Sequence, residues 1–356
     1  MNASPGRAIP LYWTLTLLLT TTAVIAVGTG ALHISPGEVL QYLLDALGIK
    51  SSLPSDPIAE GVLLQIRLPR VLLSAAVGAA LSVSGTLMQA LFRNPIVEPG
   101  LVGTSSGAAF GAAMVFVWGK NMGILTSGLI GDLLLPLCAF LTGLAATLIV
   151  YRLSTAGGKT TVATMLLSGI AVNAVAAAGT GFLAYIARDP QARSITFWSL
   201  GTLSGADWRG CVIVWTVTVA GILTTLRFSK ALNALLLGES EAAHLGIDTE
   251  RLKTRILFLN TLIVAVATSF VGVIAFVGLV VPHLLRLLGG SENRYLIIAS
   301  SLAGALVMVL TDTLARLIIA PAELPIGIIT AIVGAPVFLW LLLTRVQGKN
   351  AGGFYA

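Results

Sequence analysis

Long apolar runs separated by short polar stretches make up most of this 356-residue chain. A helix of about 20 apolar residues is long enough to cross the hydrocarbon core of a bilayer. Judged by length, the pattern predicts about ten such helices. Their expected bounds are residues 11–32, 62–92, 101–118, 129–151, 162–186, 208–226, 256–274, 276–288, 295–319 and 326–343. The sequence therefore predicts an all-α integral membrane protein, with one transmembrane domain over residues 1–356.

Composition and charge support this interpretation. Hydrophobic residues make up 56% of the chain and charged residues 10%, whereas an ordinary soluble domain is about 25% charged. Most of the 21 Lys and Arg residues fall in segments on the side of the N-terminus, as expected of cytoplasmic loops. Both termini are therefore expected in the cytoplasm. The net charge of +6 follows from topology, and no nucleic-acid partner is expected. The first run is too long for a cleavable signal peptide and is expected to remain as a span.

Two of the predicted spans are irregular. The span at 62–92 would be about 45 Å long at 1.5 Å per residue, so it must tilt or project beyond the hydrocarbon. The span at 276–288 is short and is expected to end at Pro282. Short or broken helices line ligand paths in transporters, because freed backbone groups are tolerated only where protein or water satisfies them. This irregularity favours a transport function.

The longest predicted cytoplasmic connection covers residues 227–255 and contains a cluster of charged residues. Its pattern predicts a short amphipathic helix, a break at Gly238, a second short helix and a stop at Gly246. One interpretation is a solvated loop. The other is a surface on which a partner docks, which we favour because two compact helices exceed what a simple connection needs.

Several motifs resemble those of a known transporter family. They are RLPR at 67–70, RNPIVEPGLVGTSSG at 93–107, GESEAAHLGI at 238–247, FVGLVVPHLLR at 276–286 and AELPIGIITAIVGAPVFLWLL at 322–342. In this order, and over nearly the whole chain, they resemble the permease subunit of type II ATP-binding-cassette (ABC) importers. This FecCD family handles iron-siderophores, haem and cobalamin.

The resemblance implies a set of partners and a location. Two permease copies would form a homodimer around a central path, two ATPase subunits would bind ATP and Mg²⁺, and a periplasmic binding protein would deliver the substrate. The chain itself would bind no cofactor. It would be a multi-pass protein of the bacterial inner membrane.

The resemblance also assigns Arg67, Arg70 and Arg316 to docking of the binding protein through its acidic residues. A physical argument supports this role, since Arg67 and Arg70 are three apart on one helix face and guanidinium suits bidentate carboxylate recognition. Asp312 lies four residues before Arg316, so a pair within the helix would orient that arginine. The alternative is that these are ordinary arginines at the membrane interface.

Two further groups of residues receive roles from the resemblance. Coupling to the ATPase is expected at Leu235, Leu236, Leu237, Gly238, Glu239, Glu241, Ala242 and Gly246. A cytoplasmic gate is expected at Thr160 and Thr161. From the residues themselves, the spacing of Gly103, Gly107 and Gly111 predicts close helix packing. Thr104, Ser105 and Ser106 beside them are candidate polar residues of the path wall.

Other functional classes find less support. The segment GGKTT imitates the end of a phosphate-binding loop, but Leu153 stands where its first glycine is required. His33, His244 and His283 are far apart in sequence, and no metal motif or catalytic set is present, so neither a metal site nor an enzyme is expected. An ion-coupled carrier would keep an ionisable residue in the membrane interior, where each costs about 2.5–3.5 kcal/mol. Asp132 and Asp312 fall near predicted span ends instead.

The sequence predicts the permease subunit of an ATP-driven importer of an iron chelate. Haem is favoured because the segment EPGLVGTSSGAAFGAA at 98–113 looks more like haem permeases than cobalamin permeases. A siderophore or cobalamin substrate is the alternative within the family, and an ion-coupled secondary transporter is the alternative outside it.

Overall fold

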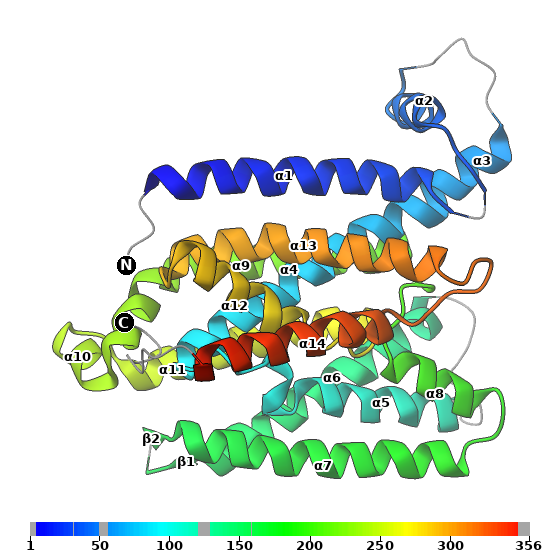
Figure 1. Ribbon diagram of the computed structural model, residues 1–356. Coiled ribbons are helices and arrows are strands. Elements are labelled where there is room, and N and C mark those ends of the chain that lie inside the picture. The colour runs from blue at the N-terminus through cyan, green and yellow to red at the C-terminus, as the bar shows by residue number, and fades with distance from the viewer. Residues whose placement is uncertain (1–4, 31, 50–55, 120–128, 158, 348–356) are drawn as a thin grey trace.

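The computed structural model describes residues 5–30, 32–49, 56–119, 129–157 and 159–347. Long helices run side by side along one direction, with short elements at both ends (Figure 1). In this described part, seven helices are long and apolar enough to cross a membrane, and three shorter apolar helices accompany them. The predicted all-α membrane architecture is therefore confirmed.

The elements follow one another in this order: α1 Pro5–Gly28, α2 Pro36–Ala46, α3 Pro57–Gly61, the π-helical turn η1 Val62–Arg67, α4 Leu68–Leu91, the 3₁₀ turn η2 Pro99–Val102, α5 Thr104–Trp118, α6 Leu129–Ser154, β1 Thr155–Ala156, β2 Lys159–Thr160, α7 Val162–Ile186, α8 Gln191–Ser199, α9 Trp208–Leu237, α10 Glu239–His244, α11 Thr249–Val271, α12 Val277–Gly289, α13 Asn293–Leu317 and α14 Ile326–Gln347.

The two ends of the molecule carry different elements (Figure 1). The start of α1, the end of α14, the β1–β2 hairpin and α10 lie together at one end, which we call the α10 end. The short helices α2, α3 and α8 lie at the opposite end, the α8 end. This arrangement agrees with both termini lying on one side of a membrane. That this side is the cytoplasm stays a prediction.

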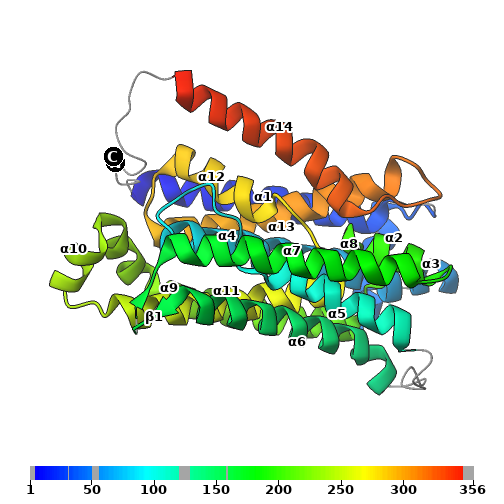
Figure 2. The same cartoon turned by 90° about the horizontal axis from the view of Figure 1, so that it is seen from below.

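Helix α4 is the centre of the packing. With α3 and η1 it forms one continuous helix, and it is buried among α9, α11, α12 and α13 (Figures 1 and 2). Gly78 of α4 lies directly against Gly304 of α13, which lets the two backbones approach closely. The predicted long span at 62–92 is thus longer than expected and runs through the protein interior.

The short helix α12 does not end at Pro282, so that prediction is wrong. The helix runs through the proline to Gly289. Proline has no N–H, so residue 282 leaves the carbonyl of Gly278 without its usual helical donor. That carbonyl lies directly against the Cα of Gly85 in α4, where a side chain would have no room. The proline and the missing Cβ therefore occur at the same helix contact.

Helices α5, α6 and α7 pack together beside this centre. A Cβ added to Gly107 of α5 would lie 2.6 Å from the Cβ of Ala146 in α6, and one added to Gly111 would lie 2.7 Å from the carbonyl oxygen of Cys138. The close packing predicted for these two glycines is confirmed. Gly103 has another reason to be glycine, since it precedes α5 with φ 93°.

Several boundaries differ from the predicted ones. Helices α2 and α8 were not predicted, because both are short and carry polar residues. The connection at 227–255 is not a loop for most of its length, since α9 continues to Leu237 and α11 already begins at Thr249. The predicted bounds end at the first charged residues because they are set by the length of each apolar run. The backbone stays helical beyond those residues, where the charged side chains reach water.

Candidate functional site

The segment around α10 is a compact projection between two long helices. Gly238 has φ 135° and ends α9, and Gly246 has φ 82° after α10. Both values lie where glycine meets no Cβ penalty. The predicted break at Gly238 and stop at Gly246 are therefore confirmed, while the predicted first short helix is the continuation of α9.

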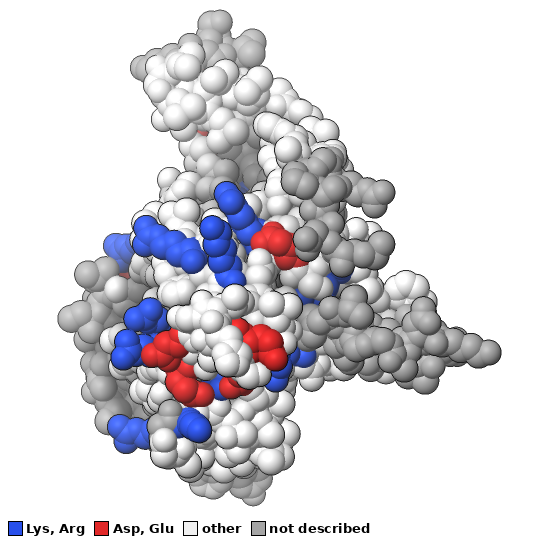
Figure 3. Space-filling view, turned by 90° about the vertical axis from the view of Figure 1, so that its left-hand side faces the viewer, with Lys and Arg blue, Asp and Glu red and all other residues white. Residues whose placement is uncertain are grey.

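This segment exposes both apolar and acidic side chains. Leu237 is 69% and Leu245 64% exposed. Figure 3 looks onto this end and shows acidic residues gathered in the middle with Lys and Arg around them. Leu235 and Ala242 are buried in the chain's own core. These two therefore hold the segment in place from inside, and Leu236 is half-buried. The coupling role of the three residues stays a prediction.

The two glutamates of α10 have different surroundings. The hydroxyl of Ser240 donates to Glu241 at 2.7 Å and lowers the pKa of that exposed carboxyl, so it is charged at neutral pH. The carboxylate of Glu239 instead accepts from the ammonium of Lys253 at 2.7 Å. Glu241 is thus the freer of the two to meet a partner.

The predicted gate residues lie at the same end. Thr160 in β2 is buried, and its N–H donates to the Glu250 carboxylate at 2.9 Å. Thr161 is exposed and occupies the N-cap position of α7. Sequence reasoning missed Lys253 and Glu250, although a lysine three residues after a glutamate is a recognised helical pair. The gate role itself stays a prediction.

A cavity of about 190 Å³ lies deeper in the molecule, beside the middle of α4. Its lining comes from α4, η2, α5, α7, α11 and the turn before α12. Among the lining residues are Glu98, Ser105, Ser106 and Asn173. Two of the three candidate path residues therefore face this space. The third, Thr104, is fully buried and bonded to the Thr147 hydroxyl at 2.7 Å, so it packs α5 against α6.

Glu98 is the ionisable residue of this cavity. Its carboxylate accepts a hydrogen bond from the backbone N–H of Phe276 at 3.1 Å. Asn173 reaches the same cavity from α7, and its buried Oδ1 has no hydrogen-bond partner in the described part of the chain. Sequence reasoning placed no ionisable residue inside the membrane because residue 98 stands between two predicted spans. The re-entrant turn η2 carries it inward.

The three predicted docking arginines are not accessible. Arg67 and Arg70 are each 6% exposed. The guanidinium of Arg67 donates to the carbonyls of Val27, Gly28 and Leu32 after the end of α1. Both guanidinium groups are therefore occupied inside the protein, and the role of the two arginines in docking stays a prediction.

Arg70 and Arg316 share one buried carboxylate. Nε of Arg70 donates to Asp312 at 2.9 Å, and Nε of Arg316 donates to it at 3.2 Å. Arg70 also donates to Glu323 at 2.8 Å. The predicted pairing of Asp312 with Arg316 is confirmed, but it fixes the arginine inside the protein. Exposed arginines at the α8 end include Arg188 and Arg193, on either side of the start of α8, and Arg209, which pairs with Asp132.

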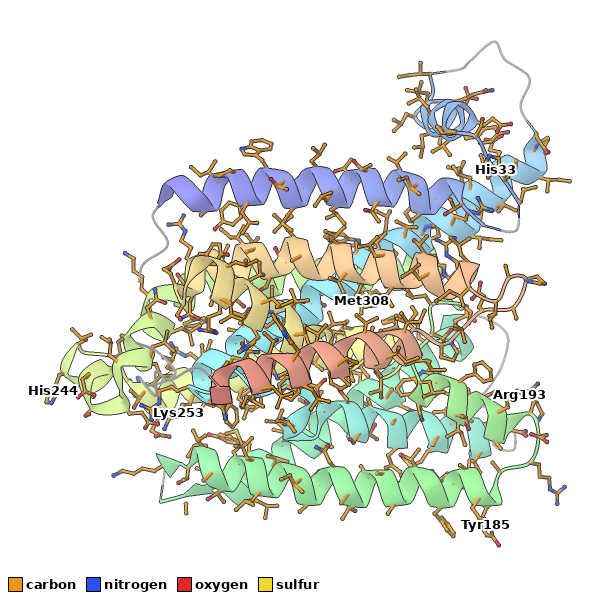
Figure 4. All side chains as sticks on the ribbon, viewed as in Figure 1. His33, Tyr185, Arg193, His244, Lys253 and Met308 are labelled. Carbon is orange, nitrogen blue, oxygen red and sulfur yellow. The ribbon has the colours of Figure 1, made fainter. Side chains whose placement is uncertain are left out.

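The three histidines do not gather into a metal site in the described part of the chain. His33 and His244 lie at opposite ends of the molecule (Figure 4). Among the described residues, no group of three or more His, Cys, Asp or Glu is placed to hold a metal ion. Gly158 of the segment GGKTT lies outside the described residues. The neighbouring Thr155 and Thr160 belong to a hairpin between α6 and α7.

The model of the FecCD transport family matches residues 17–344. The chain belongs to this family. It is 42% identical over 290 residues to the hemin transport system permease protein HmuU of Yersinia pestis, covering 81% of this chain and 84% of that one. It is 38% identical over 338 residues to the vitamin B12 import system permease protein BtuC of Klebsiella pneumoniae, covering 94% of each.

A solved structure gives the same result. An inward-facing conformation of a metal-chelate type ABC transporter is matched with a TM-score of 0.79 at 32% identity, covering 94% of this chain and 99% of that chain. The protein is therefore a permease of the ABC importer type, a multi-span component of membrane transport. Permeases of this family act with ATPase and binding-protein partners.

Proposed function

We propose that this chain is the permease subunit of an ATP-driven importer that moves an iron chelate, most specifically haem, from a periplasmic binding protein to the cytoplasm. The observation that carries the proposal is the α10 segment. It presents the exposed Leu237 and Leu245 and the charged Glu241 together on one projection at the end of the bundle. Such a surface suits a soluble partner, and an ATPase subunit on a separate polypeptide is that partner.

A second copy of this chain would complete the path. Helices α7 and α14 expose large apolar side chains, with Tyr185 of α7 at 87% and Ile332 of α14 at 67%. Helix α7 lines the Glu98 cavity through Asn173, and α14 packs against α12, which lines it through Gly278. Figure 2 shows α7 and α14 on the outside of the bundle. A homodimer that joins these faces would cover the cavity, with Ser105, Ser106 and Asn173 on its wall.

Docking of the binding protein belongs to the α8 end. The guanidinium groups of Arg188 and Arg193 are accessible there and have no ion pair in the described part of the chain, which suits them to carboxylates of a partner. Arg67, Arg70 and Arg316 would support this surface by tying α1, α4 and α13 together. The complex would reside in a bacterial inner membrane.

The identity of the chelate is tested by competition. Hemin, cobalamin and a ferric siderophore would be offered together to vesicles containing the permease, its ATPase and the binding protein encoded beside it. The proposal predicts ATP-dependent accumulation of hemin with little of the other two. Accumulation of cobalamin in preference to hemin would transfer the chain to the cobalamin branch of the family.

A secondary transporter is the second candidate, favoured by Glu98. A carboxylate in a cavity beside the middle of α4 is the kind of residue that ion-coupled carriers keep. Under that function, uptake would follow an ion gradient and Glu98→Gln would abolish it. Under the proposed function, uptake would need ATP. Glu98→Gln would then change the rate of substrate passage, and uptake would still depend on ATP.

A further inference from the structure

Lys253 connects three separate elements at the α10 end. Its ammonium donates to the Glu239 carboxylate of α10 at 2.7 Å, to the Glu250 carboxylate of α11 at 3.0 Å and to the Thr160 carbonyl of β2 at 3.2 Å. An ammonium group has three N–H donors, so each of them has an acceptor. The side chain is 4% exposed. This lysine is therefore an internal connection and not part of the charged surface.

Both polar backbone groups of Thr160 are held by α11. Lys253 binds its carbonyl, and the Glu250 carboxylate accepts from its N–H at 2.9 Å. The hairpin is also closed on itself, since the N–H of Thr161 donates to the Ser154 carbonyl at 3.2 Å. Because α7 begins at Val162, directly after this hairpin, the position of Thr160 sets the position of the first turn of α7.

We propose that Lys253 is a positioning residue that makes α10 and the start of α7 move together. This inference rests on the proposed function, in which an ATPase subunit displaces α10. Helix α7 carries Asn173 into the cavity. A displacement of α10 would thus reach the path wall through Glu239, Lys253, Thr160 and α7.

Electrostatics explains why this connection resists separation. One buried ammonium lies between two carboxylates that face it from α10 and from its own helix. Pulling α10 away would leave the ammonium with one carboxylate fewer and would expose Glu239 unpaired. The Lys253 side chain is 4% exposed while that of Glu239 is 39% exposed, so the cost of separation falls mainly on the ammonium, which would lose a partner without gaining water. The three elements therefore behave as one body.

The test uses the assembled importer in vesicles, with the ATPase and the binding protein present. Two quantities are measured together, the rate of ATP hydrolysis and the amount of substrate imported per ATP. For Lys253→Met, which keeps an unbranched side chain one atom shorter and removes the charge, we expect hydrolysis close to that of the wild type. Import per ATP should fall about fivefold or more, the range of a typical coupling between two sites. Lys253→Arg should restore part of it.

A second variant covers the case in which Lys253→Met does not fold. Glu239→Gln removes the carboxylate charge that faces Lys253 from α10, while the hydrogen bonds of Lys253 and Glu250 to Thr160 stay in place. It should also lower import per ATP. Arg251→Met is the matched control, because Arg251 pairs with Asp248 next to α11 in an exposed ion pair, which is its only ion pair among the described residues. This control should import as the wild type does.

The outcomes separate the two claims. If wild-type vesicles import with ATP and both Lys253→Met and Glu239→Gln keep the wild-type ratio of import to hydrolysis, this inference is wrong while the proposed function stands. If wild-type vesicles do not import with ATP, the proposed function itself fails. Spin labels at Lys159 and His244, both exposed, give an independent measurement. Their distance distribution should be narrow and unchanged by nucleotide in the wild type, and broad in Glu239→Gln.

Discussion

The carboxylate of Asp312 in α13 lies 2.9 Å from the guanidinium of Arg70 in α4, although the two residues are far apart in the sequence. Asp312 also accepts from Arg316 of its own helix at 3.2 Å. Its side chain is almost fully buried, as are those of both arginines. Removing it would leave two buried cations facing each other.

We therefore expect Asp312→Ala to destabilise the protein by about 3–5 kcal/mol, the usual cost of breaking a buried ion pair by removing one partner. Thermal unfolding in detergent would measure this. Asp132→Ala is the control, since Asp132 pairs with Arg209 in an exposed bridge that should contribute about 0–1 kcal/mol. Equal effects of the two variants would contradict the assignment of Asp312 as a structural centre.

The contact between Gly85 and Gly278 makes a second prediction. Gly85→Ala places a methyl group against the carbonyl of Gly278 and should cost about 1–3 kcal/mol, as overpacking usually does. Gly181→Ala is the matched change in α7, where an added Cβ meets nothing within 4 Å. Comparison of the two unfolding temperatures checks the prediction. If Gly85→Ala is as stable as Gly181→Ala, the α4–α12 contact is looser than described.

The ATPase should dock through the exposed part of the α10 segment. The double variant Leu237→Glu, Glu241→Lys puts a charge in place of an apolar side chain and reverses the charge at position 241. We expect the affinity for the ATPase subunit to fall about tenfold or more, as at an interface hot spot. Co-purification with the ATPase measures it. Leu47→Glu, at an equally exposed leucine after α2, should bind normally. If the double variant binds the ATPase subunit as tightly as the wild type does, the α10 segment is a solvated connection and not a docking surface.

Docking of the binding protein should depend on accessible charge at the α8 end. Arg193→Glu should weaken this docking, and raised salt should weaken the wild-type complex, because exposed charge pairs are screened. Binding to permease in detergent is the measurement. Arg316→Glu should instead lower the unfolding temperature, since Arg316 donates to the carbonyls of Ala26 and Thr29. Normal stability with lost docking in Arg316→Glu would restore the surface role predicted from the motif.

The sequence was sufficient for the architecture because seven of the helices are long and apolar enough to be recognised as membrane spans from the sequence alone. It was also sufficient for the turns at Gly238 and Gly246 and for the packing of Gly107 and Gly111, since these depend on local geometry or on regular spacing. The helical ends beyond the membrane, such as the last turns of α9, carry charge and escaped the criterion of apolar length.

Side-chain partners could not be predicted in the same way. Arginine at a span end suits both an interface and an internal ion pair, and only the contacts of Arg70 with Asp312 and Glu323 decide between them. Glu98 enters the interior because η2 folds back between helices distant in the sequence. Lys253 likewise meets Thr160 across a separation that no local pattern encodes.

The central claim is that transport through this chain is driven by ATP hydrolysed on another polypeptide. The most direct measurement is hemin uptake into vesicles that contain the chain alone or with its ATPase and binding protein, each with and without ATP and with and without an imposed ion gradient. We predict uptake only when ATPase, binding protein and ATP are all present, with no response to the gradient. Gradient-driven uptake by the chain alone would contradict the account.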